Sequence, residues 1–153
     1  MNEHIIIGDS TLGPRVGEGL FSDGHTFNTG DDICTYEGDL LEMDVAAESN
    51  SDYLFKINKD WVMDAQDPDS CYGRYLNDPI FLSKVNAKIK ANTRDLTAKV
   101  IATKRIKAGD EIFTSYGSDY WHDIDKYNLL NKRQQNYLYE NGTRKFQKWV
   151  DGL

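Results

Sequence analysis

Short strand-like runs separated by turn residues fill the first 121 positions of the chain, and this spacing limits the folds open to it. The links between the runs are rich in Gly, Asp and Asn, which favour turns. Many short strands with turns at this spacing are typical of a mostly β domain. Strand candidates lie at residues 5–7, 20–21, 33–36, 53–57, 61–65, 87–90 and 96–103, and the last four pair as two predicted hairpins.

A helical pattern begins only near position 120. Apolar and aromatic residues then recur every three to four residues as far as Leu138, and Asn141 with Gly142 is a typical helix stop. This period predicts one amphipathic α-helix from Asp123 to Glu140, which packs on the β body and is followed by a short tail.

The chain has 153 residues, enough for a single domain with one hydrophobic core. No run approaches the roughly 18 apolar residues of a membrane span, and the first residues lack the basic start and apolar stretch of a signal peptide. The two cysteines, Cys34 and Cys71, are too few for a zinc cluster, and we expect both to be free and buried. These features predict an intracellular protein with no membrane partner and no metal.

Charge is unevenly distributed along the chain, whose net charge is −7. Residues 31–69 hold twelve acidic side chains against two lysines, whereas residues 122–153 hold six basic and four acidic side chains. The acidic stretch is either a solvated surface or a surface that attracts a cationic partner such as a lysine-rich peptide. Direct binding of nucleic acid is not expected, since the phosphate backbone would meet mostly carboxylates.

The segment EIFTSYGSDYW at residues 111–121 carries the strongest chemical signal. It follows a strand and a Gly-containing turn, and it places Tyr116 at a strand end, before a glycine and two further aromatic residues. A phenol held in this way can point into a narrow apolar channel, and the following aromatic residues can line that channel or stack on a flat ring. By itself, a tyrosine at a strand end is common core material.

A Gly-x-Gly stands between two strand-like runs in the segment GEGLF at residues 17–21. It lacks the third glycine and the following helix of a dinucleotide-binding fingerprint, and no Lys-Ser or Lys-Thr pair follows to make a phosphate loop. The segment is therefore either a hairpin bend or a place where two glycines let the backbone approach a small ligand.

Two further segments place polar side chains among aromatic ones. Asn77 lies in DSCYGRYLNDP at residues 69–79, where its side chain offers both a donor and an acceptor, although Asn-Asp-Pro alone signals a turn. The segment ICTYEGD at residues 33–39 places a second tyrosine, Tyr36, at a strand end beside a glycine.

Taken in order, these segments resemble the SET-domain protein lysine methyltransferases over roughly residues 5–121. Each segment alone is moderately specific, and their shared order identifies the family. The matching segments are GEGLF at 17–21 for the family's Gly-x-Gly with an apolar pair, TYEGD at 35–39 for Tyr-x-Gly-Glu with Asp39 in place of Glu, RYLND at 74–78 for Arg-Phe-x-Asn-His, and GDEIFTSYG at 109–117 for Gly-Glu-Glu-Leu-x-x-x-Tyr-Gly.

The resemblance implies a mostly β fold of small curved sheets with a pseudoknot, plus a C-terminal α-helix. In the pseudoknot, the segment around Tyr116 crosses the segment around Asn77. The SET domain would cover residues 1–121. Residues 122–153 would form a helical extension that packs on it and closes the active site in place of the cysteine cluster that follows many SET domains.

The resemblance also implies S-adenosyl-L-methionine as the methyl donor, without a metal. The backbone of the Gly-x-Gly and the Asn77 side chain would hold this cofactor on one face of the domain, and Trp121 would cover its adenine. The implied cofactor-binding residues are Gly17, Glu18, Gly19, Asn77, Asp78, Tyr116 and Trp121.

The substrate lysine would enter from the opposite face through a channel lined by the implied catalytic residues, Tyr36 and Tyr116. A free lysine has a pKa near about 10.4, so it must lose a proton before its lone pair can attack the methyl group. An apolar channel beside a cationic sulfonium favours that loss through desolvation and like-charge repulsion. Tyr116 would orient the amine rather than act as a strong base, and alignment would supply the remaining acceleration.

The chain departs from the family pattern at Asp78, which stands where the family has a histidine. Cofactor binding survives this change if the position acts through its backbone, and weakens if a side-chain hydrogen bond matters. The link from Asn77 to Asn86 is also longer than usual. Thr114 and Ile89 lie where the family often has a bulky aromatic residue, which leaves space for a second or third methyl group.

The leading hypothesis is a minimal, single-domain SET protein of the viral or protist type that methylates a histone tail in chromatin, and hence works in the nucleus. One alternative is a non-histone protein lysine methyltransferase in the cytoplasm. Another is a catalytically weak SET-like module that binds a peptide, which Asp78 keeps open. A plain β-rich interaction domain with these tyrosines in its core is a weaker alternative, and a homodimer through the C-terminal helix stays open.

Overall fold

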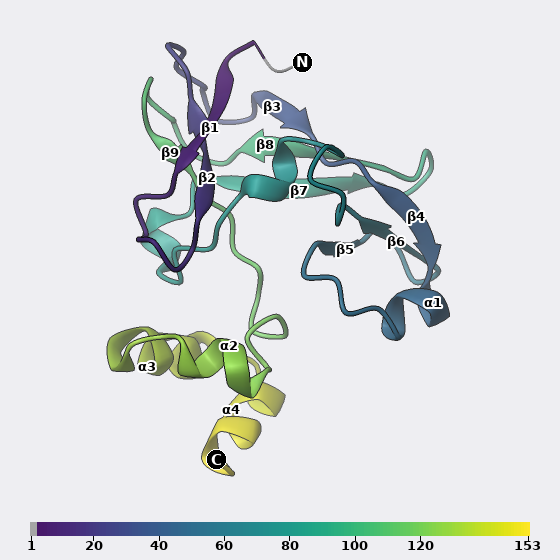
Figure 1. Ribbon diagram of the computed structural model, residues 1–153, viewed down its shortest axis with the longest axis vertical. Helices are drawn as coiled ribbons and strands as arrows, with labels where there is room; N and C mark the ends of the chain where they lie inside the picture. The colour runs from purple at the N-terminus through teal and green to yellow at the C-terminus, as the bar shows by residue number, and fades with distance from the viewer. Residues whose placement is uncertain (1–2) are drawn as a thin grey trace. The chain divides into compact units, whose positions relative to one another are not determined.

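The computed structural model describes residues 3–153, which divide into two compact units. Unit 1 comprises the described residues 3–77 and Asn86–Thr114, and unit 2 comprises Asp78–Val85 and Ser115–Leu153. Within the described residues, the strands all belong to unit 1, and the three C-terminal helices belong to unit 2 (Figure 1). The predicted division into residues 1–121 and 122–153 stays a prediction.

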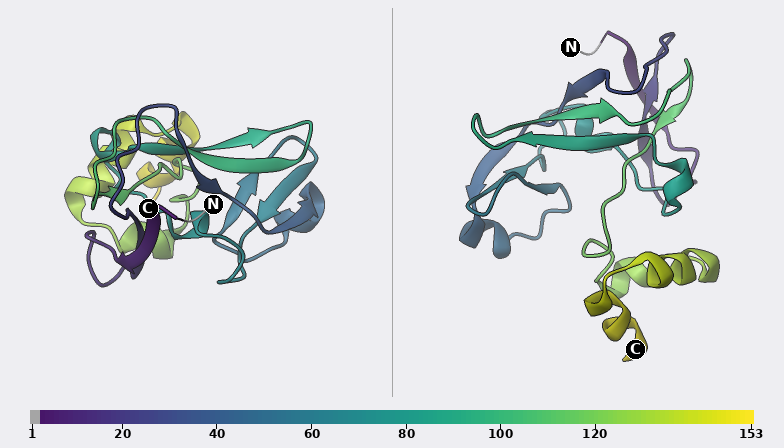
Figure 2. Two further views of the ribbon diagram at one scale, coloured as in Figure 1. Left: turned by 90° about the horizontal axis from the view of Figure 1, so that it is seen from above. Right: turned by 180° about the vertical axis from the view of Figure 1, so that it is seen from behind.

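Three small antiparallel sheets make up the β part of unit 1. The first has the order β1 (Ile5–Asp9), β2 (Glu18–Ser22) and β9 (Glu111–Ile112). The second has the order β3 (Asp32–Thr35), β8 (Thr97–Ala102) and β7 (Ala87–Asn92), and the third has the order β4 (Asp39–Glu42), β6 (Trp61–Asp64) and β5 (Leu54–Lys56). Figure 1 and Figure 2 show the second sheet lying between the other two.

Alternation of buried and exposed side chains sets the register of the β7–β8 hairpin. Ala98, Val100 and Ala102 of β8 are buried, whereas Thr97 and Lys99 between them are exposed. A shift of one residue would turn the buried set toward solvent, so the pattern specifies a single register. The hairpins predicted from the sequence, β5–β6 and β7–β8, are both confirmed.

The strand β4 and the short helix α1 (Met43–Ala47) were not predicted. No residue of β4 is buried, so the strand lacks the alternation of apolar and polar side chains on which such a prediction rests. It is a strand because its backbone pairs with β6, where Leu40 lies opposite Met63.

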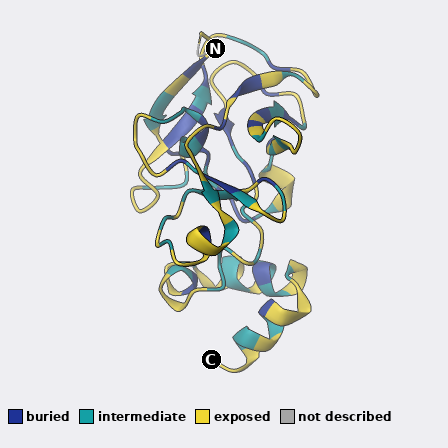
Figure 3. Cartoon of the chain, turned by 90° about the vertical axis from the view of Figure 1, so that its right-hand side faces the viewer, coloured by how far each residue is buried: buried dark blue, intermediate teal, exposed yellow. Residues whose placement is uncertain are grey.

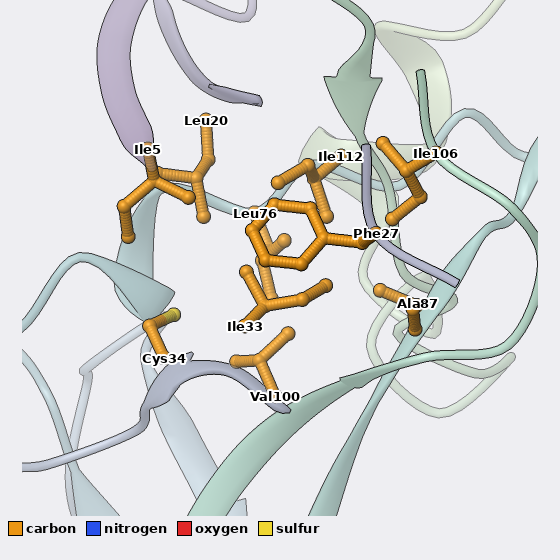
Figure 4. Close-up of a cluster of buried hydrophobic side chains, with 11 residues drawn as sticks. Ile5, Leu20, Phe27, Ile33, Cys34, Leu76, Ala87, Val100, Ile106 and Ile112 are labelled. Atoms are coloured by element: carbon orange, nitrogen blue, oxygen red, sulfur yellow. The ribbon is translucent and has the colours of Figure 1, made fainter. Parts of the chain in front are cut away.

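Buried apolar side chains from the first and second sheets meet in the main core of unit 1 (Figure 4). Leu20 of β2, Val100 of β8 and Ile112 of β9 are fully buried there, and Leu76 joins them from the segment after the short 3-10 helix η1 (Gly73–Tyr75). A second cluster contains Tyr36, Ile57, Met63, Ala65 and Ala98.

The chain that ends at Thr114 is hydrogen-bonded to two distant segments. Phe113 forms a parallel bridge with Asn77, and the Thr114 amide donates to the Asn77 carbonyl at 3.0 Å. The Phe113 carbonyl accepts from the amides of Asn86 and Ala87, and the Phe113 amide donates to Oδ1 of Asn86 at 2.8 Å. This arrangement is the predicted crossing, and with the three sheets it confirms the expected fold class.

The C-terminal part of unit 2 forms three helices, not the single helix predicted: α2 (Ile124–Asn128), α3 (Lys132–Asn141) and α4 (Arg144–Asp151). Asn131 divides the predicted helix, because its side chain and that of Gln134 cap each other's backbone amides and so start α3 anew. The predicted tail is helical, since the Thr143 hydroxyl accepts from the Phe146 amide at 3.2 Å and starts α4.

The core of unit 2 is small. Phe146 is fully buried and packs with Ile80, Tyr127 and Leu138, while much of the helix surface remains exposed (Figure 3). Ile80 precedes the 3-10 helix η2 (Leu82–Lys84), so the segment between Asn77 and Asn86 supplies part of this core. Among the described helices, none has the length and apolar character needed to cross a membrane.

Candidate active site

The Gly-x-Gly lies where the β1–β2 turn enters β2, and its two glycines serve different purposes. Gly17 has φ of +81°, a conformation that favours glycine, and a Cβ at this position would meet nothing within 4 Å. A Cβ at Gly19 would overlap the carboxylate of Glu111 and come within 3.3 Å of Nδ2 of Asn77. Gly19 therefore makes room for two side chains of the protein itself, and the open backbone is at Gly17.

Asn77 connects the Gly-x-Gly to the crossing. Its Nδ2 donates to the Glu18 carbonyl at 2.8 Å, and its own carbonyl accepts from the Thr114 amide. The structure thus brings together Glu18, Gly19 and Asn77, three of the residues predicted to bind the cofactor.

Glu111 of β9 was not predicted as a site residue, yet it organises the loop that precedes Gly17. Its carboxylate is buried and accepts hydrogen bonds from the Ser10 hydroxyl at 2.8 Å and from both the amide and the hydroxyl of Thr11 at 2.7 Å. A buried carboxylate is costly unless such donors satisfy it. The one available signal was a charged residue beside the apolar Ile112, at a strand position that the structure buries.

Tyr36 lies in the second core cluster, where it is 5% exposed. Its hydroxyl donates to the Tyr53 carbonyl at 2.6 Å, and burial raises the pKa of its phenol well above the usual range. Gly73 of η1 packs against it, because a Cβ at Gly73 would lie 3.1 Å from Cδ2 of Tyr36. The phenol is therefore neutral, and its proton is directed to a backbone carbonyl.

Three aromatic residues of unit 2 form a cluster consisting of Tyr116, Tyr120 and Trp121. The ring centroids of Tyr116 and Tyr120 are 4.4 Å apart, and those of Tyr120 and Trp121 are 5.0 Å apart in an edge-to-face arrangement. The Trp121 indole also lies roughly parallel to the Tyr116 ring, at 6.2 Å and 26°. Lys126 places its Nζ 4.0 Å from the Tyr120 centroid, a cation–π contact.

Asp78 is buried in unit 2, and three N–H groups donate to its carboxylate. Oδ1 accepts from the Ile80 amide at 2.7 Å, and Oδ2 accepts from the Tyr116 amide at 2.9 Å and from Nε1 of Trp121 at 3.1 Å. Burial raises the pKa of the Asp78 carboxyl above its usual value, although the three donors oppose that shift.

The predicted site residues therefore fall into two groups. Unit 1 contains Gly17, Glu18, Gly19, Asn77 and Tyr36, and unit 2 contains Asp78, Tyr116 and Trp121. Glu111 and Tyr120 lie against predicted site residues, and sequence reasoning did not include them. Tyr120 carried a signal, because it is one of the two aromatic residues that closely follow Tyr116.

The sulfur and metal chemistry of the described residues is limited. Cys34 and Cys71 are both free, and Cys34 is buried as predicted, whereas Cys71 is only half-buried. Burial raises the pKa of the Cys34 thiol from 9.0 to about 12. Within residues 3–153, no three His, Cys, Asp or Glu side chains are grouped so that they could hold a metal ion.

A family model described as SET domain matches residues 17–117. Among solved structures, a chain from the crystal structure of the Chaetomium thermophilum polycomb repressive complex 2 matches with 27% identity and a TM-score of 0.60. A chain from a humanized mutant of the same complex, bound to the inhibitor GSK126, matches with 29% identity and a TM-score of 0.61. Each match covers 74% of this chain but only 15% of the other. No curated protein matches this chain.

We expect Glu111→Gln to lower the free energy of unfolding by about 2 kcal/mol, because the carboxamide turns an N–H₂ toward groups that are themselves donors. Urea denaturation followed by circular dichroism measures this change. Glu48→Gln is the matched control, since this glutamate is exposed and we expect a change within about 0.5 kcal/mol. Equal unfolding midpoints for the two variants would contradict the role given to Glu111.

The raised pKa of Cys34 predicts a slow reaction with thiol reagents. A rise from 9.0 to about 12 lowers the thiolate fraction at pH 8 about a thousandfold, and burial slows the attack further. The rate of reaction with a disulfide reagent is measured on two folded variants, each of which keeps one thiol. Cys34→Ser, which keeps Cys71, should react fast, and Cys71→Ser, which keeps Cys34, should react slowly. The Cys34 rate should rise with pH, and equal rates for the two thiols would refute the prediction.

Proposed function

This chain belongs to the SET domain family, and from that membership we propose that it is a protein-lysine N-methyltransferase that uses S-adenosyl-L-methionine. The observation that carries the proposal is the crossing, in which the chain leading to Tyr116 is hydrogen-bonded to Asn77. Three of the four matching segments, those that contain Gly19, Asn77 and Glu111, therefore also meet in space, which their order along the chain alone does not require.

The residues around Gly17 fit a small polar ligand. The Gly17 backbone faces open space, and the exposed Glu18 follows it with its carbonyl held by Asn77. In our proposal, this backbone and Asn77 hold the cofactor, and the aromatic faces of Trp121 and Tyr116 cover its flat ring. When bound, the cofactor supplies a methyl group on a cationic sulfur.

The tyrosines have separate tasks in this proposal. The Tyr36 hydroxyl already donates to the Tyr53 carbonyl, so Tyr36 can line an apolar channel but does not serve as a base. Tyr116 would orient the substrate amine. The aromatic channel would favour the neutral lysine, whose unperturbed pKa is about 10.4, because desolvation disfavours the ammonium ion.

A basic peptide, such as a histone tail, is the substrate class that we propose. The acidic stretch at residues 31–69 attracts cations, and a surface hollow of about 470 Å³ lies within it, lined by Glu42, Met43, Asp44, Asp60 and Trp61. A histone substrate implies work in the nucleus, and a non-histone substrate would not require it. Methylation of a peptide array that holds both classes separates the two.

Calorimetric titration of S-adenosyl-L-methionine tests the cofactor site. We expect saturable binding, with affinity about tenfold weaker in Asn77→Ala, because the variant loses the hydrogen bond that holds the Glu18 carbonyl. Asn136→Ala, an exposed position on α3, is the matched control and should bind like the unsubstituted protein. If millimolar cofactor gives no heat of binding, the proposal that this chain binds the cofactor in the absence of substrate is refuted.

Tyr116→Phe tests catalysis separately from binding. Loss of the hydroxyl should lower the rate of methyl transfer to a lysine peptide by about a hundredfold, since alignment of the amine is lost, while cofactor affinity changes little. Mass spectrometry of the peptide measures the transfer and counts the methyl groups added. Tyr137→Phe removes a hydroxyl from α3 as a control. Unchanged transfer by Tyr116→Phe would overturn the role of this phenol.

A further inference from the structure

We propose that Asp78 is a positioning residue whose side chain sets the orientation of the Trp121 indole beside Tyr116 and thereby tunes affinity for the cofactor. The proposal rests on the proposed function, which assigns these two aromatic residues to the cofactor site. It also assigns a role to Asp78, which stands in place of the histidine in the family's Asn-His pair.

The chemistry of the three partners requires an acceptor at this position. Two of the groups that face Asp78 are backbone amides, from Ile80 and Tyr116, and the third is the indole Nε1–H of Trp121. All three can only donate. A carboxylate has two oxygens with about four acceptor sites, whereas a neutral histidine accepts at one nitrogen and would leave donors unsatisfied.

The two carboxylate oxygens have different roles. Oδ1 binds the turn that follows Asp78, through the amide of Ile80. Oδ2 binds the aromatic segment at two points, the backbone of Tyr116 and the ring of Trp121. One oxygen thus anchors the carboxylate, and the other transmits its position to the aromatic cluster.

The turn that holds the carboxylate is itself strongly constrained. Ile80 has φ of +70°, a conformation that a β-branched residue adopts only when its surroundings enforce it. Its side chain is 5% exposed and packs in the core with Phe146 and Tyr127, and its amide is held by Asp78. The carboxylate is therefore fixed with respect to the core of unit 2.

The fixed carboxylate holds one ring of the aromatic cluster, the Trp121 indole, in place. The Tyr120 ring meets the Trp121 indole at 79°, and the indole lies at 26° to the Tyr116 ring. The bond from Nε1 to Asp78 fixes the rotation of the indole about its side-chain torsions. Because Trp121 is only half-buried, packing alone leaves that rotation less restricted.

A double-mutant cycle tests the proposal, with Asp78→Asn, Trp121→Phe and the double variant compared by cofactor titration. Asp78→Asn keeps the shape but loses acceptor capacity, and Trp121→Phe keeps an aromatic ring but loses the indole N–H. We expect each single change to weaken cofactor binding about tenfold. The two effects should not add, so the double variant should bind with the affinity of the weaker-binding single variant. Tyr137→Phe is the matched control, because it removes another hydrogen bond of unit 2, from the Leu82 amide, and should leave binding unchanged.

Two outcomes of the cycle would overturn the proposal. If Asp78→Asn lowers thermal stability but binds the cofactor with the affinity of the unsubstituted protein, Asp78 is only structural. If the two single effects add in the double variant, Asp78 does not act through Trp121. If Asp78→Asn does not fold, the test rests on Trp121→Phe. Unchanged cofactor affinity in Trp121→Phe would show that the indole does not contribute to the site, and this would overturn the proposal.

A readout without cofactor separates this proposal from the proposed function. The indole N–H resonance of Trp121, assigned from its loss in Trp121→Phe, should shift in Asp78→Asn and stay in place in Tyr137→Phe. An unmoved resonance in Asp78→Asn would show that Asp78 does not hold the indole. If the unsubstituted protein binds no cofactor, the proposed function and the effect on affinity both fail, and a shifted resonance then supports only the hold on Trp121.

Discussion

The hydrogen-bonded crossing at Phe113 is the constraint on which the described structure depends. The backbone of Phe113 is paired with Asn86 and Ala87, and the amide of the next residue, Thr114, is paired with Asn77. Buried backbone groups must find such partners, so the chain has little freedom here. Glu111 lies two residues before Phe113 and pairs with Phe21 of β2 in unit 1, and Tyr116 lies two residues beyond Thr114. A change that breaks these pairs would disturb both the main core and the predicted site.

Each of the two units contains a buried carboxylate that accepts three hydrogen bonds. Glu111 accepts three hydrogen bonds from Ser10 and Thr11 in unit 1, and Asp78 accepts three from backbone and indole N–H groups in unit 2. An unsatisfied buried carboxylate would be strongly destabilising, so each holds its partners in a defined arrangement. The partners of Glu111 precede the Gly-x-Gly, and the partners of Asp78 include Tyr116 and Trp121. Each carboxylate therefore holds groups that lie close in sequence to residues predicted for the site, which the motifs themselves do not reveal.

The elements that local patterns could reveal were predicted, and the others were not. The β7–β8 hairpin follows from side chains that alternate between core and solvent, whereas β4 has no buried residue and gave no such signal. The predicted C-terminal helix was wrong in extent, because the capping box at Asn131 starts a new helix within a continuous apolar period. That cap could have been seen in the sequence, since an Asn followed three residues later by Gln is its signature.

The mostly β class, the two hairpins and the order of motifs that identifies the SET family can be read from the sequence alone, because these depend on spacing within short segments. Which polar groups meet depends instead on tertiary packing. Glu111 reaches Thr11 across a separation of 100 residues, and Asp78 reaches Trp121 across 43. Such pairs form only when packing brings together segments that are far apart in the sequence. A local pattern of apolar and polar residues does not specify which segments meet. The reason for a glycine at position 19 and the task of an aspartate at position 78 therefore emerged only from the fold.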